Sequence, residues 1–113
     1  MSRKSVAARL TEAAPIFAAL GDPTRLRIVI RLCASGPSSI VRLTEGADVS
    51  RQAITKHLRA LEQAGLVHSD RSGRESVWEL QPKRLDEVRG YLNQISEQWD
   101  ATLGRLKAFV ESE

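Results

Sequence analysis

The sequence predicts one mainly α-helical domain with a small β-hairpin and a long C-terminal helix. Apolar residues recur at helical spacing through most of the 113 residues. Two strand-like runs flank Ser72-Gly73-Arg74, and an apolar seam follows them to about residue 110. We expect a single domain, 1–113, because hydrophobic residues make up 42% and charged residues 27%, which are globular values.

The N-terminal part is expected to form two helices. Residues 6–20 have a helical apolar pattern, in which Pro15 either begins a helix or kinks a longer one. Gly21-Asp22-Pro23 then separates two helices, since the aspartate can cap the second and the proline suits its first position. Residues 26–32 are apolar on more than one side, which predicts a central helix that ends at Ser35-Gly36-Pro37.

The middle of the chain predicts two helices joined by a short turn. We expect a short helix over about Ser39–Gly46, a tight turn at Ala47-Asp48-Val49, and a second helix capped by Ser50 and ended by Gly65. A basic second helix after such a turn is the layout of a helix-turn-helix. Its buried stripe is expected to be Ile54, Leu58 and Leu61.

The opposite face of this second helix is polar and basic. Such side chains reach phosphates and base edges of duplex DNA, although the sequence leaves open which side chain contacts which. Taken alone, the helix also fits an ordinary solvated surface. Charge favours a polyanion partner, because residues 1–82 carry twelve Lys/Arg against eight Asp/Glu, whereas residues 83–113 carry five against six. The expected DNA-binding residues here are Ser50, Arg51, Gln52, Thr55, Lys56 and Arg59.

A hairpin directly follows this helix. Residues 66–71 and 75–80 are strand-like, and the glycine of the turn between them suits a positive φ. Arg71 and Arg74 lie at or near the tip, and Trp78 is expected in the core at the base. A basic hairpin in this position predicts a wing that holds phosphates or the minor groove.

The segment from Lys83 to about Val110 predicts one helix of roughly 40 Å. Its apolar residues follow alternating steps of three and four, and one small core cannot cover a seam of that length. The same helix of a second subunit would cover it, and the alternative is packing against the first helix of its own chain. The expected dimerisation residues are Leu10, Phe17, Leu92, Ile95, Trp99, Leu103 and Leu106.

With these elements in this order, the chain resembles the ArsR family of winged helix-turn-helix repressors. The residues that carry the likeness are Ala19–Ile28, Val49–Leu58, Leu61–Val67, the wing residues Arg71, Gly73 and Arg74, and Gln98-Trp99-Asp100. The resemblance implies a homodimer built from the first and last helices. It also implies binding to a two-fold symmetric operator and repression that an unidentified inducer relieves.

The chain departs from the metal-sensing members of that family. Their cysteine-bearing segment corresponds to Ser39–Leu43, which has no thiolate, and residues 83–110 contain no histidine. The turn carries Gly46, Ala47 and Asp48 where other residues are usual, so the preceding helix is expected to be short or loosely packed. The resemblance is therefore to the branch without metal sites, and we expect no metal ligands and no cofactor.

Other reactive side chains are expected to be structural. His57 lies between core residues in the sequence, so we expect its side chain to be packed and hydrogen-bonded to the backbone. Cys33 is the single cysteine, and we expect its thiol to be buried and inert. We expect no set of converging ligands around His68 and no clustered carboxylates. Catalytic motifs are missing, so no catalytic residue and no enzyme activity are predicted.

Membrane and export signals are also missing from the sequence. No apolar run approaches ~18 residues, and residues 1–20 lack the apolar core of a signal peptide, so a cytoplasmic protein is expected. Two alternatives remain to the metal-independent repressor. One is a metal- or thiol-responsive repressor of the same fold, and the other is a winged-helix adaptor that binds a protein.

Overall fold

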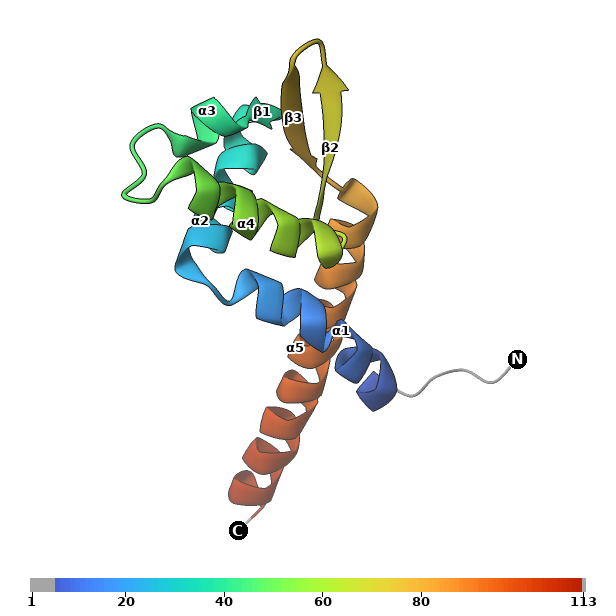
Figure 1. Ribbon diagram of the computed structural model, residues 1–113. Coiled ribbons are helices and arrows are strands. Elements are labelled where there is room, and N and C mark those ends of the chain that lie inside the picture. Colours follow the sequence, from blue (N-terminus) through green and yellow to red (C-terminus); the bar gives the residue numbers. More distant parts are fainter. Residues whose placement is uncertain (1–5, 113) are drawn as a thin grey trace, which may run out of the picture.

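The computed structural model describes residues 6–112, apart from the side chains of residues 6, 7, 9, 10 and 72. A bundle of helices packs against a small sheet, and the last helix extends away from both (Figure 1). The predicted mainly α-helical winged helix-turn-helix is confirmed. The elements are α1 (Val6–Leu20), α2 (Pro23–Ser35), β1 (Ser38–Ser39), α3 (Ile40–Thr44), α4 (Arg51–Gln63), β2 (Val67–Ser72), β3 (Glu75–Leu80) and α5 (Pro82–Glu111).

The first two helices follow from their proline and aspartate residues. Pro15 lies inside α1 and does not begin it, and the ribbon of α1 bends along its length (Figure 1). Asp22 caps α2 by accepting the N–H of Arg25 at 3.0 Å, and Pro23 is the first residue of the helix. The expectation that α2 is central is only partly right, because Ile30 on its outer side is 59% exposed.

The sheet has three strands where the sequence predicted two. The hairpin pairs β2 with β3 in antiparallel register from Val67 opposite Leu80 to Ser72 opposite Glu75, so the predicted hairpin is confirmed. The strand that the sequence did not predict is β1, in which Ser38 lies opposite Trp78. Two serines carry no alternating pattern, so only the pairing with β3 defines them as a strand. Trp78 is 2% exposed at the base of the hairpin, as expected.

The helix-turn-helix differs from its prediction in the first helix and the turn. α3 spans only Ile40–Thr44, because Ser39 still belongs to the sheet and caps the helix. The prediction of a tight three-residue turn was wrong, because the connection between α3 and α4 spans residues 45–50, which are all non-helical. Gly46 has a φ of +71° within this longer connection, which is a conformation that favours glycine.

The second helix of the motif, α4, is held at both ends and along one face. The Ser50 hydroxyl accepts the N–H of Ala53 at 3.1 Å. At the other end Gly65 has a φ of +77°, and the N–H of Leu66 donates to the carbonyl of Leu61 at 3.0 Å, which is a Schellman motif. The predicted stripe Ile54, Leu58 and Leu61 is fully buried at 0% exposed.

The last helix, α5, begins in the core and leaves it. Val88 is buried, and Leu85 and Tyr91 pack against the core cluster. From residue 92 onward every large apolar side chain of α5 is exposed, so packing against the first helix does not cover the seam. The molecule is therefore elongated, with dimensions of 67 × 38 × 20 Å.

Two expected dimerisation residues on α1 have different outcomes. Phe17 is half-buried and packs against the core of its own chain, while the side chain of Leu10 lies outside the described part of the structure.

Among the helices of residues 6–112, none combines the length and hydropathy that a membrane span requires.

Candidate nucleic-acid interface

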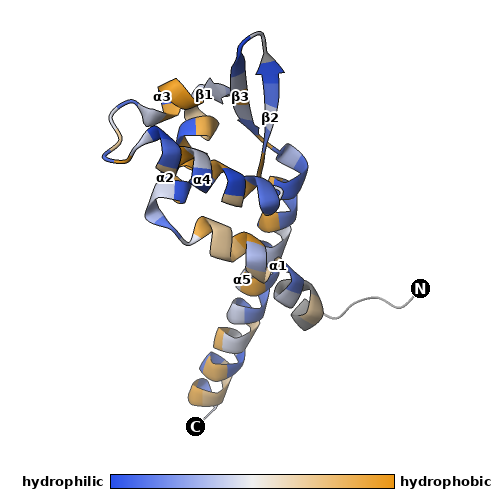
Figure 2. Ribbon diagram, viewed as in Figure 1, coloured by the Kyte–Doolittle hydropathy of each residue, from blue (hydrophilic) through white to orange (hydrophobic). Residues whose placement is uncertain are grey.

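The face of α4 opposite the core is exposed and basic. Arg51, Gln52 and Lys56 are all exposed, and their side chains have no hydrogen-bond or ion-pair partner within residues 6–112. Hydrophilic segments alternate with hydrophobic ones along α4, and most of the hairpin outside its base is hydrophilic (Figure 2). Because the opposite stripe is fully buried, the rotation of α4 about its axis is fixed and these donors point to solvent.

Two hydroxyl-bearing residues of the same helix already have intramolecular partners. Ser50 uses its hydroxyl oxygen as the helix cap, which leaves its O–H free to donate. The Thr55 hydroxyl donates to the carbonyl of Arg51 at 2.9 Å, and Thr55 is half-buried. Both residues therefore support the shape of the first turns of α4 as well as lying near its exposed face.

Arg59 differs from the other basic residues of α4. Its guanidinium lies 5.6 Å from the centroid of the Trp78 ring and donates to Glu62 at 3.1 Å. It remains 62% exposed, so this cation is held by its own chain while one side stays accessible. Arg59 therefore belongs to the exposed basic residues of α4 but lies further along the helix than Arg51 and Lys56.

The wing adds two arginines from a separate element. Arg71 on β2 and Arg74 in the two-residue connection to β3 are exposed, without partners among the described side chains. The wing lies close to the start of α4, because a cavity of about 170 Å³ is lined by Arg51, by Glu75 and Ser76 of β3, and by residues 39–41. The N-terminal end of α4, α3 and the wing therefore form one continuous surface.

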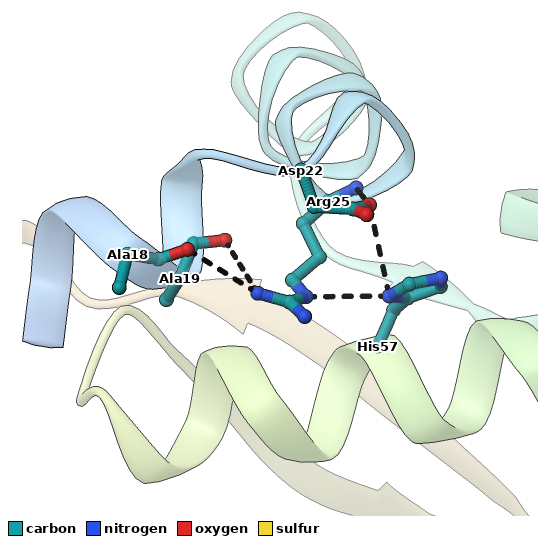
Figure 3. A network of polar contacts seen from close by, with 5 residues as sticks. All are labelled: Ala18, Ala19, Asp22, Arg25 and His57. Atoms are coloured by element: carbon teal, nitrogen blue, oxygen red, sulfur yellow. Dashed lines mark hydrogen bonds and ion pairs between the residues drawn. The ribbon is translucent and has the colours of Figure 1, made fainter.

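A polar network fixes α4 relative to α1 and α2 (Figure 3). The Arg25 side chain donates through Nε to Nδ1 of His57 at 3.3 Å, and through Nη1 to the carbonyls of Ala18 and Ala19 at 3.4 and 3.2 Å. Those carbonyls belong to the last turn of α1, where carbonyls lack partners within the helix, and that of Ala18 also accepts the N–H of Gly21 at 3.2 Å. The prediction that His57 bonds to the backbone was wrong, because its hydrogen-bond partner is the side chain of Arg25.

Asp22 completes the network from the start of α2. Its carboxylate accepts the backbone N–H of Arg25 and lies 3.8 Å from Nδ1 of His57. The hydrogen bond from the Arg25 backbone is the main reason that the pKa of Asp22 is lowered from 3.8, with the nearby His57 and Arg25 acting in the same direction against desolvation. Sequence patterns identified Asp22 only as a cap, since the partner on α4 is 35 positions away.

Cys33 does not lie where it was expected. Its side chain is exposed, because the buried face of α2 is formed by Ile28, Val29 and Leu32, and the next residue along the helix points away from that face. The prediction of a buried thiol was therefore wrong. No second cysteine exists in the chain to form an intrachain bridge.

The two segments in which the family resemblance would place metal ligands, residues 39–43 and α5, carry no cysteine and no histidine. In residues 39–43 Ser39 caps α3 and Leu43 is buried in the core, and α5 contains no histidine. These residues do not fit a metal site with thiolate or imidazole ligands.

Another group of possible ligands lies on the wing, where none was expected. His68 and Glu79 are opposite each other in the β2–β3 ladder, with Nε2 and Oε1 2.6 Å apart, and Oδ2 of Asp70 is 3.9 Å from the same Nε2. All three ligand atoms lie within 4.8 Å of one another. The expectation that no carboxylates cluster near a histidine was therefore wrong.

Comparison with known proteins places this geometry among regulators. Residues 20–70 match a family model described as a helix-turn-helix domain. An HTH-type transcriptional regulator of Mycobacterium tuberculosis is 36% identical over 95 residues, which cover 84% of this chain and 85% of that protein. The arsenical resistance operon repressor of Bacillus subtilis is 33% identical over 78 residues, covering 69% and 71% respectively.

Solved structures give the same result for the fold. An ArsR-like transcriptional regulator from Rhodococcus sp. RHA1 superposes with a TM-score of 0.74 and 38% identity, covering 88% of this chain and 93% of that one. A homodimeric winged helix-turn-helix DNA-binding domain from Mycobacterium bovis, described as a possible ArsR-family regulator, superposes with a TM-score of 0.63. It is 26% identical and covers 87% of this chain and 91% of that one.

The Asp22 cap gives a pH-dependent prediction. Because the folded-state pKa of Asp22 is lowered, its stabilising effect is present above the ordinary pKa and is lost as pH falls through the folded-state value. The difference in urea midpoint between the wild type and Asp22→Ala should therefore be largest at neutral pH and narrow in acid. Ser50→Ala is the matched control, because it removes a non-titrating cap worth about 1 kcal/mol and its effect should not change with pH. An Asp22→Ala difference that is constant with pH would contradict this account.

Proposed function

Because the chain belongs to the ArsR family of winged helix-turn-helix transcriptional regulators, we propose that it represses transcription as a homodimer bound to an inverted-repeat operator. The observation that carries the proposal is the basic face of α4, whose three exposed donors Arg51, Gln52 and Lys56 have no partner within the described chain. In this geometry the first turns of α4 enter the major groove. The repressors and the homodimeric DNA-binding domain among its relatives support the same function.

Each subunit would divide its contacts between bases and backbone. Gln52 suits adenine, and Arg51 or Lys56 suits guanine, since these pairs match donor and acceptor patterns in the major groove. Arg71 and Arg74 on the wing would hold flanking phosphates or the minor groove. The Ser50 hydroxyl, Thr55 and Arg59 would contribute phosphate contacts.

The exposed seam of α5 is the proposed dimer interface. Leu92, Ile95, Trp99, Leu103 and Leu106 are between 44% and 63% exposed although they are large and apolar. A continuous apolar stripe of this size on one helix is an interaction surface, and the same stripe of a second copy is its simplest complement. The pairing sets the distance between the two α4 helices, so it also determines which half-site spacing fits.

Genomic selection tests the whole proposal. Purified protein, incubated with genomic fragments at near-physiological salt with a chelator present, should enrich a short inverted repeat. Failure to enrich any sequence, together with duplex binding that does not weaken as salt rises, would favour the alternative of a protein-binding adaptor. Phosphate contacts make the affinity for DNA fall steeply as the salt concentration rises, whereas an adaptor that binds a protein makes no phosphate contacts.

Removing three cations from the proposed interface should abolish this binding. The combined variant Arg51→Ala, Lys56→Ala and Arg74→Ala is expected to lose roughly 100-fold or more in operator affinity, because base contacts contribute about 1–3 kcal/mol each. Fluorescence anisotropy at several salt concentrations measures both affinity and salt slope, and the slope should become shallower by about 0.9 per lost phosphate contact. The matched control Lys83→Ala, Arg89→Ala and Lys107→Ala removes three charges from α5 and should bind almost normally. Equal losses in the two variants would contradict the assignment of the interface.

A single charge in the seam should separate the subunits. Ile95→Glu places a carboxylate where the proposed interface excludes water, so light scattering after size-exclusion chromatography should show monomer, and operator affinity should fall by roughly 100-fold as the two half-sites lose their linkage. Ser96→Glu adds the same charge at the adjacent, polar position and should remain dimeric. A dimeric Ile95→Glu variant would place the interface elsewhere.

The wing cluster of His68, Asp70 and Glu79 favours a second candidate, a repressor that responds to a divalent metal. For the metal-independent repressor, adding Zn²⁺ or Ni²⁺ to chelator-treated protein should leave operator affinity unchanged, because α4 and its supports are complete without an ion. The same titration with His68→Ala is the control. A metal-dependent change in affinity that His68→Ala removes would establish the second candidate instead.

A further inference from the structure

A cavity of about 150 Å³ lies between α2 and the connection from α3 to α4. Its lining includes three core side chains, Ile28, Leu43 and Ile54, which are 3%, 3% and 0% exposed. Residues 45–49 of the connection form another part of its wall and lead directly to the cap of α4. A cavity with both apolar and charged lining residues is therefore built next to the segment that leads into α4.

The turn contributes two small residues to the wall of this cavity. Gly46 and Ala47 line it, and no atom lies within 4 Å of the point where a Cβ would stand on Gly46. The same two residues stand where the resemblance makes other residues usual, which predicted that the preceding helix is short or loosely packed, and α3 has only 5 residues.

Two arginines of α2, one turn apart, line the same cavity. Nη1 of Arg31 donates to the carbonyls of Glu45 and Leu43 at 2.7 and 3.5 Å, which fixes the guanidinium beside the turn. The Nε and Nη2 donors of Arg31 and the whole side chain of Arg27 have no partner in the described part of the chain. Glu45 and Asp48 also line the cavity, but neither forms an ion pair with these guanidinium groups.

We propose that this cavity binds a small carboxylate with an aromatic or branched aliphatic body, and that its occupation weakens DNA binding. An apolar cavity of about 150 Å³ accommodates a benzene-sized molecule. A carboxylate on such a body would pair with the free edge of Arg31, since guanidinium and carboxylate groups form two parallel hydrogen bonds. The regulatory part of this inference rests on the proposed function, whereas the binding part does not.

The direction of the effect follows from charge and position. A bound carboxylate neutralises cations beside the N-terminal end of α4, where the DNA phosphates would approach, and so reduces the attraction for the duplex. The ligand also contacts the wall formed by residues 45–49, which connects directly to Ser50. By thermodynamic linkage, a ligand that weakens DNA binding must itself bind less tightly to the DNA complex.

Benzoate is the probe for binding. Its binding is detected in ¹H–¹⁵N correlation spectra of the full chain without DNA. We expect saturable shifts of the amides of residues 46–48, with half-saturation at ~1 mM or below for a ligand of this size. Benzyl alcohol keeps the body without the charge and acetate keeps the charge without the body, so each should bind at least about tenfold more weakly. No shifts at residues 46–48, or equal responses to all three compounds, would overturn the proposed site.

Variants separate this site from general anion binding. Ala47→Leu fills the cavity while leaving Arg31 in place, and Arg31→Lys keeps the charge but loses the paired donors, so both should lose the benzoate shifts. Arg42→Ala removes an exposed arginine of α3 that does not line the cavity, and it should respond like the wild type. Thermal unfolding identifies any variant that fails to fold. If either Ala47→Leu or Arg31→Lys does not fold, the other variant still tests the site. Retention of the shifts in a folded Ala47→Leu variant would overturn the proposal.

The regulatory step is tested separately by anisotropy with the enriched operator duplex. Saturating benzoate should weaken operator binding by the wild type severalfold and should not affect the Ala47→Leu variant. Benzoate binding without any change in operator affinity would overturn the regulatory part. If the protein binds no duplex at all, the proposed function fails, while the spectra of the DNA-free protein still decide whether the cavity binds carboxylates.

Discussion

The complete burial of one face of α4 is the constraint on which the rest of the molecule depends. Ile54, Leu58 and Leu61 have no exposed surface, so the helix has a single rotation about its axis and its basic residues face outward together. The ends are fixed as well, by the Ser50 cap and by the Schellman motif at Gly65. That motif turns the chain directly into β2, so the position of the wing follows from the end of the same helix. The proposed DNA-binding surface thus depends on apolar packing that lies behind it.

A polar network complements this packing where the end of α1, the start of α2 and α4 meet. Arg25 bonds at once to the end of α1 and to His57 of α4, while Asp22 holds the start of α2. Each hydrogen bond of this kind contributes only about 1 kcal/mol, but together they fix the relative orientation of three helices, which apolar contacts alone leave less defined. Two of the segments that carry the family resemblance, Ala19–Ile28 and Val49–Leu58, therefore contact each other, where the first supplies the arginine and the second the histidine.

The isolated chain leaves two apolar surfaces uncovered, and they differ in size and shape. The seam of α5 extends over most of a helix of 30 residues. The same helix of another subunit is long enough to cover its exposed side chains. The cavity beneath the turn is small and partly enclosed by core residues. The guanidinium group of Arg27 and two donors of Arg31 that have no partner in the described chain lie beside it, so the cavity has the size of a small molecule. One surface would set the distance between two DNA-binding helices and the other would adjust the position of each. A regulator needs both a fixed geometry and a means of changing it.

The sequence by itself determined the elements whose signals are local. Helical periodicity, the caps at Asp22 and Ser50, the glycine at position 65 and the alternating hairpin gave the order of elements, and the buried stripe of α4 followed from its spacing. Tertiary structure alone decided what depends on distant partners. Ser38-Ser39 became a strand because it pairs with β3, His57 bonds to an arginine 32 positions away, and Cys33 is exposed because the rotation of α2 buries its neighbour. The cluster of His68, Asp70 and Glu79 likewise arises from strand register. Local signals fix φ and ψ, whereas contacts between elements depend on how faces orient once the core has formed.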